Sequence, residues 1–99
     1  MVNDIPAIRQ AITDAGADAL FMVDTIASLG TMEFRMDTWG VDVAVSGSQK
    51  GLMTPPGLSF CAVNANAKQS HASADLITPY WDWTARDGDE HYLLSLIHI

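Results

Sequence analysis

The chain has 99 residues, enough for at most one small domain, and 48% of them are hydrophobic, which excludes a disordered tail. Twelve acidic residues against five basic ones give a net charge of −7, and this excludes the clustered Lys and Arg on which nucleic-acid binding depends. No apolar run approaches the ~20 residues that span a bilayer, so we expect no membrane partner. No basic-then-apolar leader opens the sequence, and we expect a cytoplasmic protein.

A single cysteine, Cys61, excludes an internal disulfide and a cysteine-based metal cluster. Cys61 lies within an apolar strand pattern, so we expect a buried, inert thiol. No histidines stand at metal-ligand spacing, and we predict no metal site.

The first predicted element is a helix that begins near Ile5 and ends at Gly16. Its apolar residues recur at spacings of three and four and form one stripe. They are Ile5, Ile8, Ile12 and Ala15. Pro6 suits the first helical turn, where its missing N–H costs nothing, and Asn3 or Asp4 can cap the helix.

Three short apolar runs follow and predict strands at residues 19–23, 41–45 and 58–63. Uniformly apolar runs are typical of a mostly parallel sheet that is covered on both faces. The order of helix, strand, loop, strand, loop and strand indicates an α/β protein, with a further exposed helix within residues 64–74. Because one apolar helix cannot cover both faces of such a sheet, we expect part of a larger domain.

Two charged residues stand where two of these strands end. Asp24 closes the first apolar run, and Lys50 lies in a loop of small residues directly after the second. Since α/β proteins build ligand sites outside the carboxyl ends of their strands, a carboxylate and an amine there indicate a pyridoxal phosphate (PLP) site. Considered alone, Lys50 would be a solvated loop residue and Asp24 a turn former or helix cap.

Four sequence blocks, in a fixed order, resemble a known family. The blocks are Val23–Gly30, Trp39–Asp42, Ser46–Met53 and Pro55–Leu58. They resemble the class V aminotransferases, in particular the serine–glyoxylate and alanine–glyoxylate aminotransferases, and the resemblance covers Ile5–Tyr92. It implies an α/β fold, as a three-layer fragment of the large domain of a fold-type-I PLP-dependent transferase with a mostly parallel sheet.

The resemblance assigns roles to four residues. Lys50 matches the lysine that forms the Schiff base with PLP, and Asp24 matches the aspartate that pairs with the pyridine nitrogen. Ile26 matches the aliphatic residue that packs on one face of the ring. Gln49 matches a residue that contacts the phosphate, although an ordinary polar loop position explains Gln49 equally well.

These residue types suit the chemistry of PLP, which acts as an electron sink only while its ring nitrogen stays protonated. A carboxylate at Asp24 would favour the protonated nitrogen by direct Coulomb attraction. The amine of Lys50, once displaced by substrate, would move the substrate proton as general base and acid.

We expect residues 1–93 to be part of the PLP-binding large domain and residues 94–99 to be a non-native tail, since their sequence does not resemble the family's continuation. The full-length protein is expected to be a homodimer that moves an amino group from serine or alanine to glyoxylate. It would lie in the cytoplasm, or in a peroxisome if the source is eukaryotic. Two alternatives stay open, namely another class V enzyme such as a ureidoglycine–glyoxylate aminotransferase, and a non-catalytic α/β fragment or interaction module.

Overall fold

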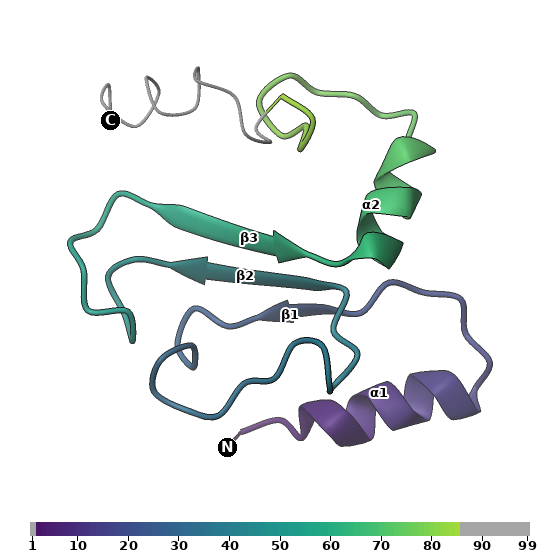
Figure 1. Ribbon diagram of the computed structural model, residues 1–99, viewed down its shortest axis with the longest axis horizontal. Coiled ribbons are helices and arrows are strands. Elements are labelled where there is room, and N and C mark those ends of the chain that lie inside the picture. Colours follow the sequence, from purple (N-terminus) through teal and green to yellow (C-terminus); the bar gives the residue numbers. More distant parts are fainter. Residues whose placement is uncertain (1, 86–99) are drawn as a thin grey trace.

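The computed structural model describes residues 2–85, which form a three-stranded sheet with a helix near each edge (Figure 1). The elements are α1 (Ile5–Asp14), β1 (Met22–Asp24), β2 (Val43–Gly47), β3 (Ser59–Val63) and α2 (Ala65–Ala72). The predicted helices and strands are therefore all present, in the predicted order. The expected tail at residues 94–99 lies outside the described residues.

The sheet is mixed, with the strand order β1-β2-β3. β1 and β2 are parallel and place Val23 beside Ala44, whereas β2 and β3 are antiparallel and place Ala44 beside Ala62. The α/β class is confirmed, but only one of the two strand pairs in this stretch is parallel, where we predicted mostly parallel pairing. The physical reason is the connection at residues 48–58, which contains no helix, whereas a parallel crossover needs about a dozen or more residues.

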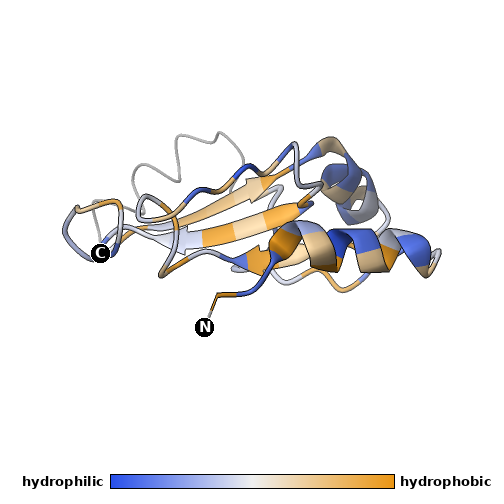
Figure 2. Ribbon diagram, turned by 90° about the horizontal axis from the view of Figure 1, so that it is seen from below, coloured by the Kyte–Doolittle hydropathy of each residue, from blue (hydrophilic) through white to orange (hydrophobic). Residues whose placement is uncertain are grey.

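Helix α1 begins where the sequence predicts. The side chain of Asp4 accepts a hydrogen bond from the Ala7 N–H at 3.1 Å, and a proline occupies the first turn. Ile5 and Ile12 pack against the core, whereas Ile8 of the same apolar stripe is exposed. Hydrophobic and hydrophilic residues alternate along the helix (Figure 2). The chain leaves the helix through Gly16 at a φ of 63°, a left-handed conformation that favours glycine.

The core is small and lies between α1 and the β1–β2 pair. It is built on Phe21, Val41 and Ala44, with Phe34 and Trp39 packed against it from the connection between the two strands. The rings of Phe34 and Trp39 meet edge to face at 5.8 Å. This cluster packs α1 and the β1–β2 connection against the first two strands.

Both faces of the sheet stay partly uncovered by residues 2–85. Side chains alternate along strands, so the pairing register puts Met22 and Phe60 on opposite faces, and they are 61% and 45% exposed. The prediction of a buried Cys61 is wrong, because β3 is an edge strand of the described sheet and the side chain is exposed. Partial desolvation still raises the pKa of the Cys61 thiol.

Asp42 joins four segments at the amino end of β2 and is only 3% exposed. One carboxylate oxygen accepts from the Phe21 N–H at 2.8 Å and lies 3.5 Å from the Arg9 guanidinium. The other oxygen accepts from the side-chain amides of Asn64 at 2.8 Å and Asn66 at 3.1 Å. Burial raises the pKa of Asp42, but these hydrogen bonds and the Arg9 charge outweigh it and hold the pKa below the usual value of 3.8.

We predict that Asp42→Asn lowers the free energy of unfolding by about 2 kcal/mol, because an amide NH₂ would face groups that only donate. Since the folded pKa lies below 3.8, the stabilisation is complete above that pH and is lost as the pH falls through the folded pKa. Urea denaturation from pH 7 to pH 2 measures both effects. Asp18→Asn, at an exposed position, is the control, and an acid dependence equal in the Asp42→Asn variant and the parent protein would contradict the assignment.

Candidate cofactor site at the carboxyl ends of β1 and β2

The first part of the site is the turn that follows β1. Asp24 is the last residue of the strand, and its carboxylate accepts from the Ile26 N–H at 2.9 Å. Between them, Thr25 is buried, and both its N–H and its hydroxyl donate to the Val45 carbonyl at 2.8 Å. The turn is thus fixed to β2, while the Asp24 carboxylate and the Ile26 side chain remain exposed.

The second part is the loop at residues 48–58 between β2 and β3, which carries Gln49 and Lys50. Ser48 is fully buried and closes this loop on itself. Its hydroxyl donates to the Pro55 carbonyl at 2.7 Å and accepts from the Leu58 N–H at 3.3 Å, and its carbonyl accepts from the Thr54 hydroxyl at 2.8 Å. A rigid frame therefore carries the exposed lysine.

The two side chains on this frame differ in their surroundings. The Gln49 side chain folds back over Gly47, where an added Cβ would lie 3.1 Å from Oε1. Lys50 is exposed, and its amine has no hydrogen-bond or ion-pair partner among residues 2–85. An amine that is not engaged in a structural ion pair is available to a ligand.

The two loops touch each other. The backbone of Gly51 lies against that of Leu29, so closely that an added Cβ at Gly51 would be 2.1 Å from the Leu29 carbonyl oxygen. β1 and β2 are parallel, so the two loops leave the same edge of the sheet (Figure 1). The structure therefore gathers Asp24 and Ile26 on one loop and Gln49 and Lys50 on the next.

This donor set fits PLP, although the described residues provide only part of a pocket. The amine, the carboxylate, an apolar side chain and a side-chain amide match the aldehyde, the ring nitrogen, the ring face and the phosphate. A hollow of about 350 Å³ takes in Asp24 and Ser28 together with Phe34 and Trp39. Gln49 and Lys50 do not line this hollow, so it is not a complete cofactor pocket.

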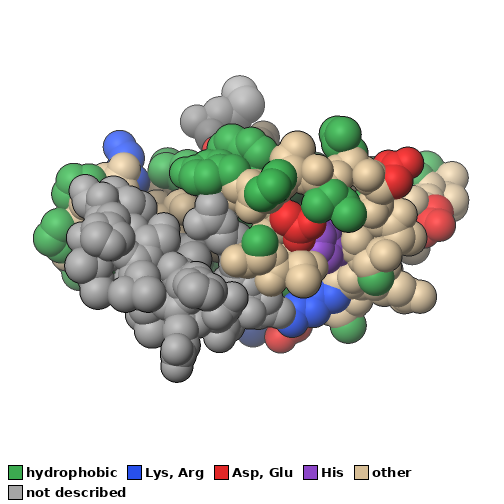
Figure 3. Space-filling view, turned by 90° about the horizontal axis from the view of Figure 1, so that it is seen from above, with side chains coloured by type: hydrophobic (Ala, Val, Ile, Leu, Met, Phe, Trp, Pro, Cys, Tyr) green, Lys and Arg blue, Asp and Glu red, His purple; other side chains and the backbone are tan. Residues whose placement is uncertain are grey.

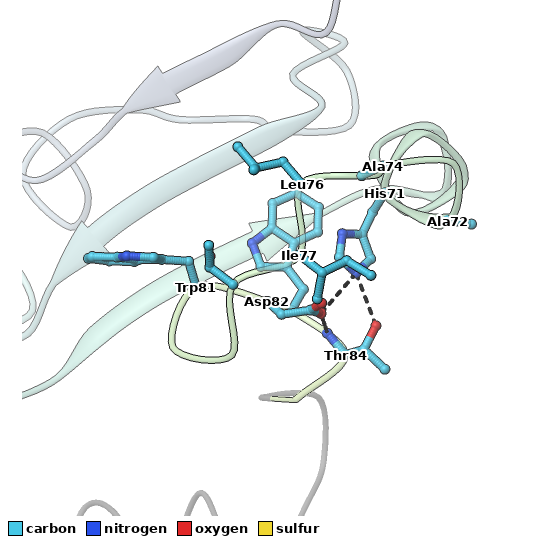
Figure 4. A pocket seen from close by; sticks show the side chains of 10 residues that line it. His71, Ala72, Ala74, Leu76, Ile77, Trp81, Asp82 and Thr84 are labelled. Atoms are coloured by element: carbon cyan, nitrogen blue, oxygen red, sulfur yellow. Dashed lines mark hydrogen bonds and ion pairs between the residues drawn. The ribbon is translucent and has the colours of Figure 1, made fainter.

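A second hollow, of about 280 Å³, lies beyond α2 and contains none of the four predicted residues (Figure 4). There His71 Nε2 lies 3.0 Å from the Thr84 hydroxyl and 3.4 Å from the Asp82 carboxylate, which also accepts from the Thr84 N–H at 2.7 Å. These contacts tie the chain after α2 back to the helix. Leu76 and Trp81, which line the same hollow, stay exposed. Hydrophobic side chains gather on the face of the molecule that is seen from above (Figure 3).

Residues 2–85 contain no group of three or more His, Cys, Asp or Glu side chains placed to hold a metal ion. Within the same range, neither helix has the length and apolar character needed to cross a bilayer.

The sequence interpretation missed the residues that hold the two loops. Ser48 and Gly51 flank Gln49 and Lys50, and Gly30 lies six residues after Asp24. The available signal was the placement of small residues directly beside the charged ones, but only the fold reveals which backbones they allow to meet.

Comparison with known proteins places the chain in a family. The profile described as Aminotransferase class-V matches residues 1–77. The L-aspartate–glyoxylate aminotransferase of Paracoccus denitrificans is 46% identical over 80 residues, covering 81% of this chain and 20% of that relative. The serine–glyoxylate aminotransferase of Methylorubrum extorquens is 42% identical over 88 residues, covering 84% of this chain and 22% of that relative.

A solved structure shares the fold as well. The ureidoglycine–glyoxylate aminotransferase of Bacillus subtilis superposes with a TM-score of 0.75 at 28% identity, covering 93% of this chain and 24% of that one. The chain spans about a fifth of the length of the curated relatives described above. By sequence and by fold, the chain belongs to the class V aminotransferases, which are PLP-dependent enzymes.

Proposed function

We propose that these residues form the cofactor-binding part of an aminotransferase that moves an amino group from serine or alanine to glyoxylate. The observation that carries the proposal is the backbone contact between the loop after Asp24 and the loop that holds Lys50. It brings an unengaged amine and an exposed carboxylate to one edge of the sheet. Membership of the class V family supports PLP as the cofactor.

PLP, when bound, supplies the electron sink that makes the Cα proton of an amino acid acidic. The residues of this chain would attach the cofactor, orient it and move that proton. Lys50 would hold the cofactor covalently and, when released, act as the general base. Asp24 would keep the ring nitrogen protonated, Ile26 would pack on the ring, and Gln49 would donate to the phosphate.

The three relatives described above are all named for glyoxylate, and this supports glyoxylate as the acceptor here. The names differ in the donor, which is aspartate, serine or ureidoglycine. We retain serine or alanine as donor, and a ureidoglycine–glyoxylate aminotransferase as the second candidate, favoured by the similarity of fold.

The proposed activity belongs to a protein of the relatives' full length, in which residues 1–93 would be part of the PLP-binding large domain and residues 94–99 a non-native tail. We propose a homodimer for that protein. The 99 residues alone would be a non-catalytic fragment, because they provide only part of a cofactor pocket. They would also dissolve poorly, because Met22 and Phe60 are exposed on opposite sheet faces and open strand edges favour aggregation.

The test is to express the full-length protein, supply PLP, and measure glycine formed from glyoxylate with serine, alanine, aspartate and ureidoglycine as separate donors. We expect serine or alanine to give the largest kcat/KM. If aspartate or ureidoglycine is preferred, the donor assignment is overturned and glyoxylate as acceptor stands. If no donor yields glycine, the proposed function is wrong.

A further inference from the structure

The contact between the two site loops depends on two glycines, and neither position has room for a side chain. An added Cβ at Gly51 would lie 2.1 Å from the Leu29 carbonyl oxygen and 2.9 Å from the Thr31 methyl group. An added Cβ at Gly30 would lie 2.7 Å from the Gly51 carbonyl oxygen. Most of these neighbours are backbone atoms, which cannot rotate away as a long side chain can.

Each loop is also fixed to the sheet at its start, so a displacement at the contact cannot be absorbed there. Thr25 bonds to the Val45 carbonyl through its N–H and its hydroxyl. Ser48 is fully buried and bonds to Pro55 and Leu58. Because the start of each loop is held against the sheet, the close approach of Gly30 and Gly51 determines how far apart the two loops stand beyond those fixed points.

We propose that Gly51, in contact with Leu29 and Gly30, is a positioning residue that sets the separation between the Lys50 amine and the Asp24 carboxylate. This inference rests on the proposed function. The pyridine ring of PLP is rigid, and its nitrogen lies across the ring from the ring carbon that bears the aldehyde group, with which the lysine reacts. A change in loop separation therefore misplaces one partner, because the ring cannot lengthen to compensate.

The test is Gly51→Ala in the full-length protein, with PLP binding and absorbance as readouts. We expect PLP to bind about tenfold more weakly and kcat to fall by up to ~100-fold, the cost of a misplacement of ~1 Å. We also expect the visible band of bound PLP to titrate at a higher pH. A ring nitrogen that carries less positive charge repels less strongly the proton on the nitrogen that joins Lys50 to the cofactor, so that proton is lost at a higher pH. A purely structural defect would not move that midpoint.

Gly16→Ala is the matched control, since Gly16 has a φ of 63° but no atom within 4 Å of an added Cβ, so it introduces backbone strain without a clash. It should leave PLP affinity and the pH midpoint unchanged. If the parent protein binds PLP, and Gly51→Ala has the same PLP affinity and the same pH midpoint as the parent, the positioning role is overturned and the proposed function stands. If the parent protein binds no PLP, the positioning role of Gly51 and the proposed function fail together.

A measurement on the parent protein covers the case in which Gly51→Ala does not fold. Hydrogen exchange with and without PLP should show increased amide protection in residues 25–32 and 48–54 together, because the contact couples the two loops. Protection confined to one loop would overturn the inference.

Discussion

Replacing Lys50 with alanine is expected to abolish covalent attachment of PLP to the full-length protein. Alanine has no amine to attach the cofactor or to move the substrate proton, so the visible band should disappear and kcat should fall by at least ~100-fold. Absorbance spectra and glycine production measure the two effects. Lys68→Ala, a change in α2 away from both loops, should retain the band.

Lys50→Arg separates the charge of Lys50 from its reactivity. Arginine keeps a positive side chain at the same position, but its guanidinium stays protonated and cannot attach the cofactor. We expect this variant to lack the band as completely as Lys50→Ala. A band that persists in either variant would show that another residue holds the cofactor.

The second large effect is expected from Asp24→Asn. Asparagine keeps the shape of the side chain and can still accept from the Ile26 N–H, so the turn after β1 should survive. It carries no negative charge to hold the ring nitrogen protonated, and we expect kcat to fall by about 100- to 1,000-fold.

Mass spectrometry after borohydride reduction should still find PLP on Lys50 in Asp24→Asn, which separates loss of the charge from loss of the site. Asp37→Asn, at an exposed aspartate later in the β1–β2 connection and beyond residues 25–32, is the control and should retain the parent kcat. If Asp24→Asn has the same kcat as the parent, the Asp24 charge is not needed to keep the ring nitrogen protonated.

The sequence was sufficient for the order of the elements but not for strand direction. The apolar stripe from Ile5 to Ile12 predicted α1, and three short apolar runs predicted the strands, because burial of one face or of a whole strand leaves a local pattern. Nothing local tells whether β3 runs with β2 or against it. The start of β2 was also misplaced, because the N–H groups of Val41 and Asp42 bond to Met36 and Phe21 outside the regular ladder.

For the candidate site, the sequence located the charged groups but not what holds them. Asp24 was recognisable because it closes an apolar run, and Lys50 because it lies in a loop of small residues that follows another apolar run. The contact between Gly30 and Gly51 joins residues far apart in the chain and involves backbone atoms, so no pattern of side chains could reveal it. Asp42 was missed for a similar reason, since its partners come from α1, the residue before β1 and the chain around the start of α2.

The attachment of PLP to Lys50 is tested most directly by reducing the PLP-loaded, full-length protein with borohydride and mapping the modified peptide. We expect the cofactor on the peptide that contains Lys50, at the side-chain nitrogen of that residue. PLP on any other peptide, with Lys50 unmodified, would show that Lys50 does not hold the cofactor.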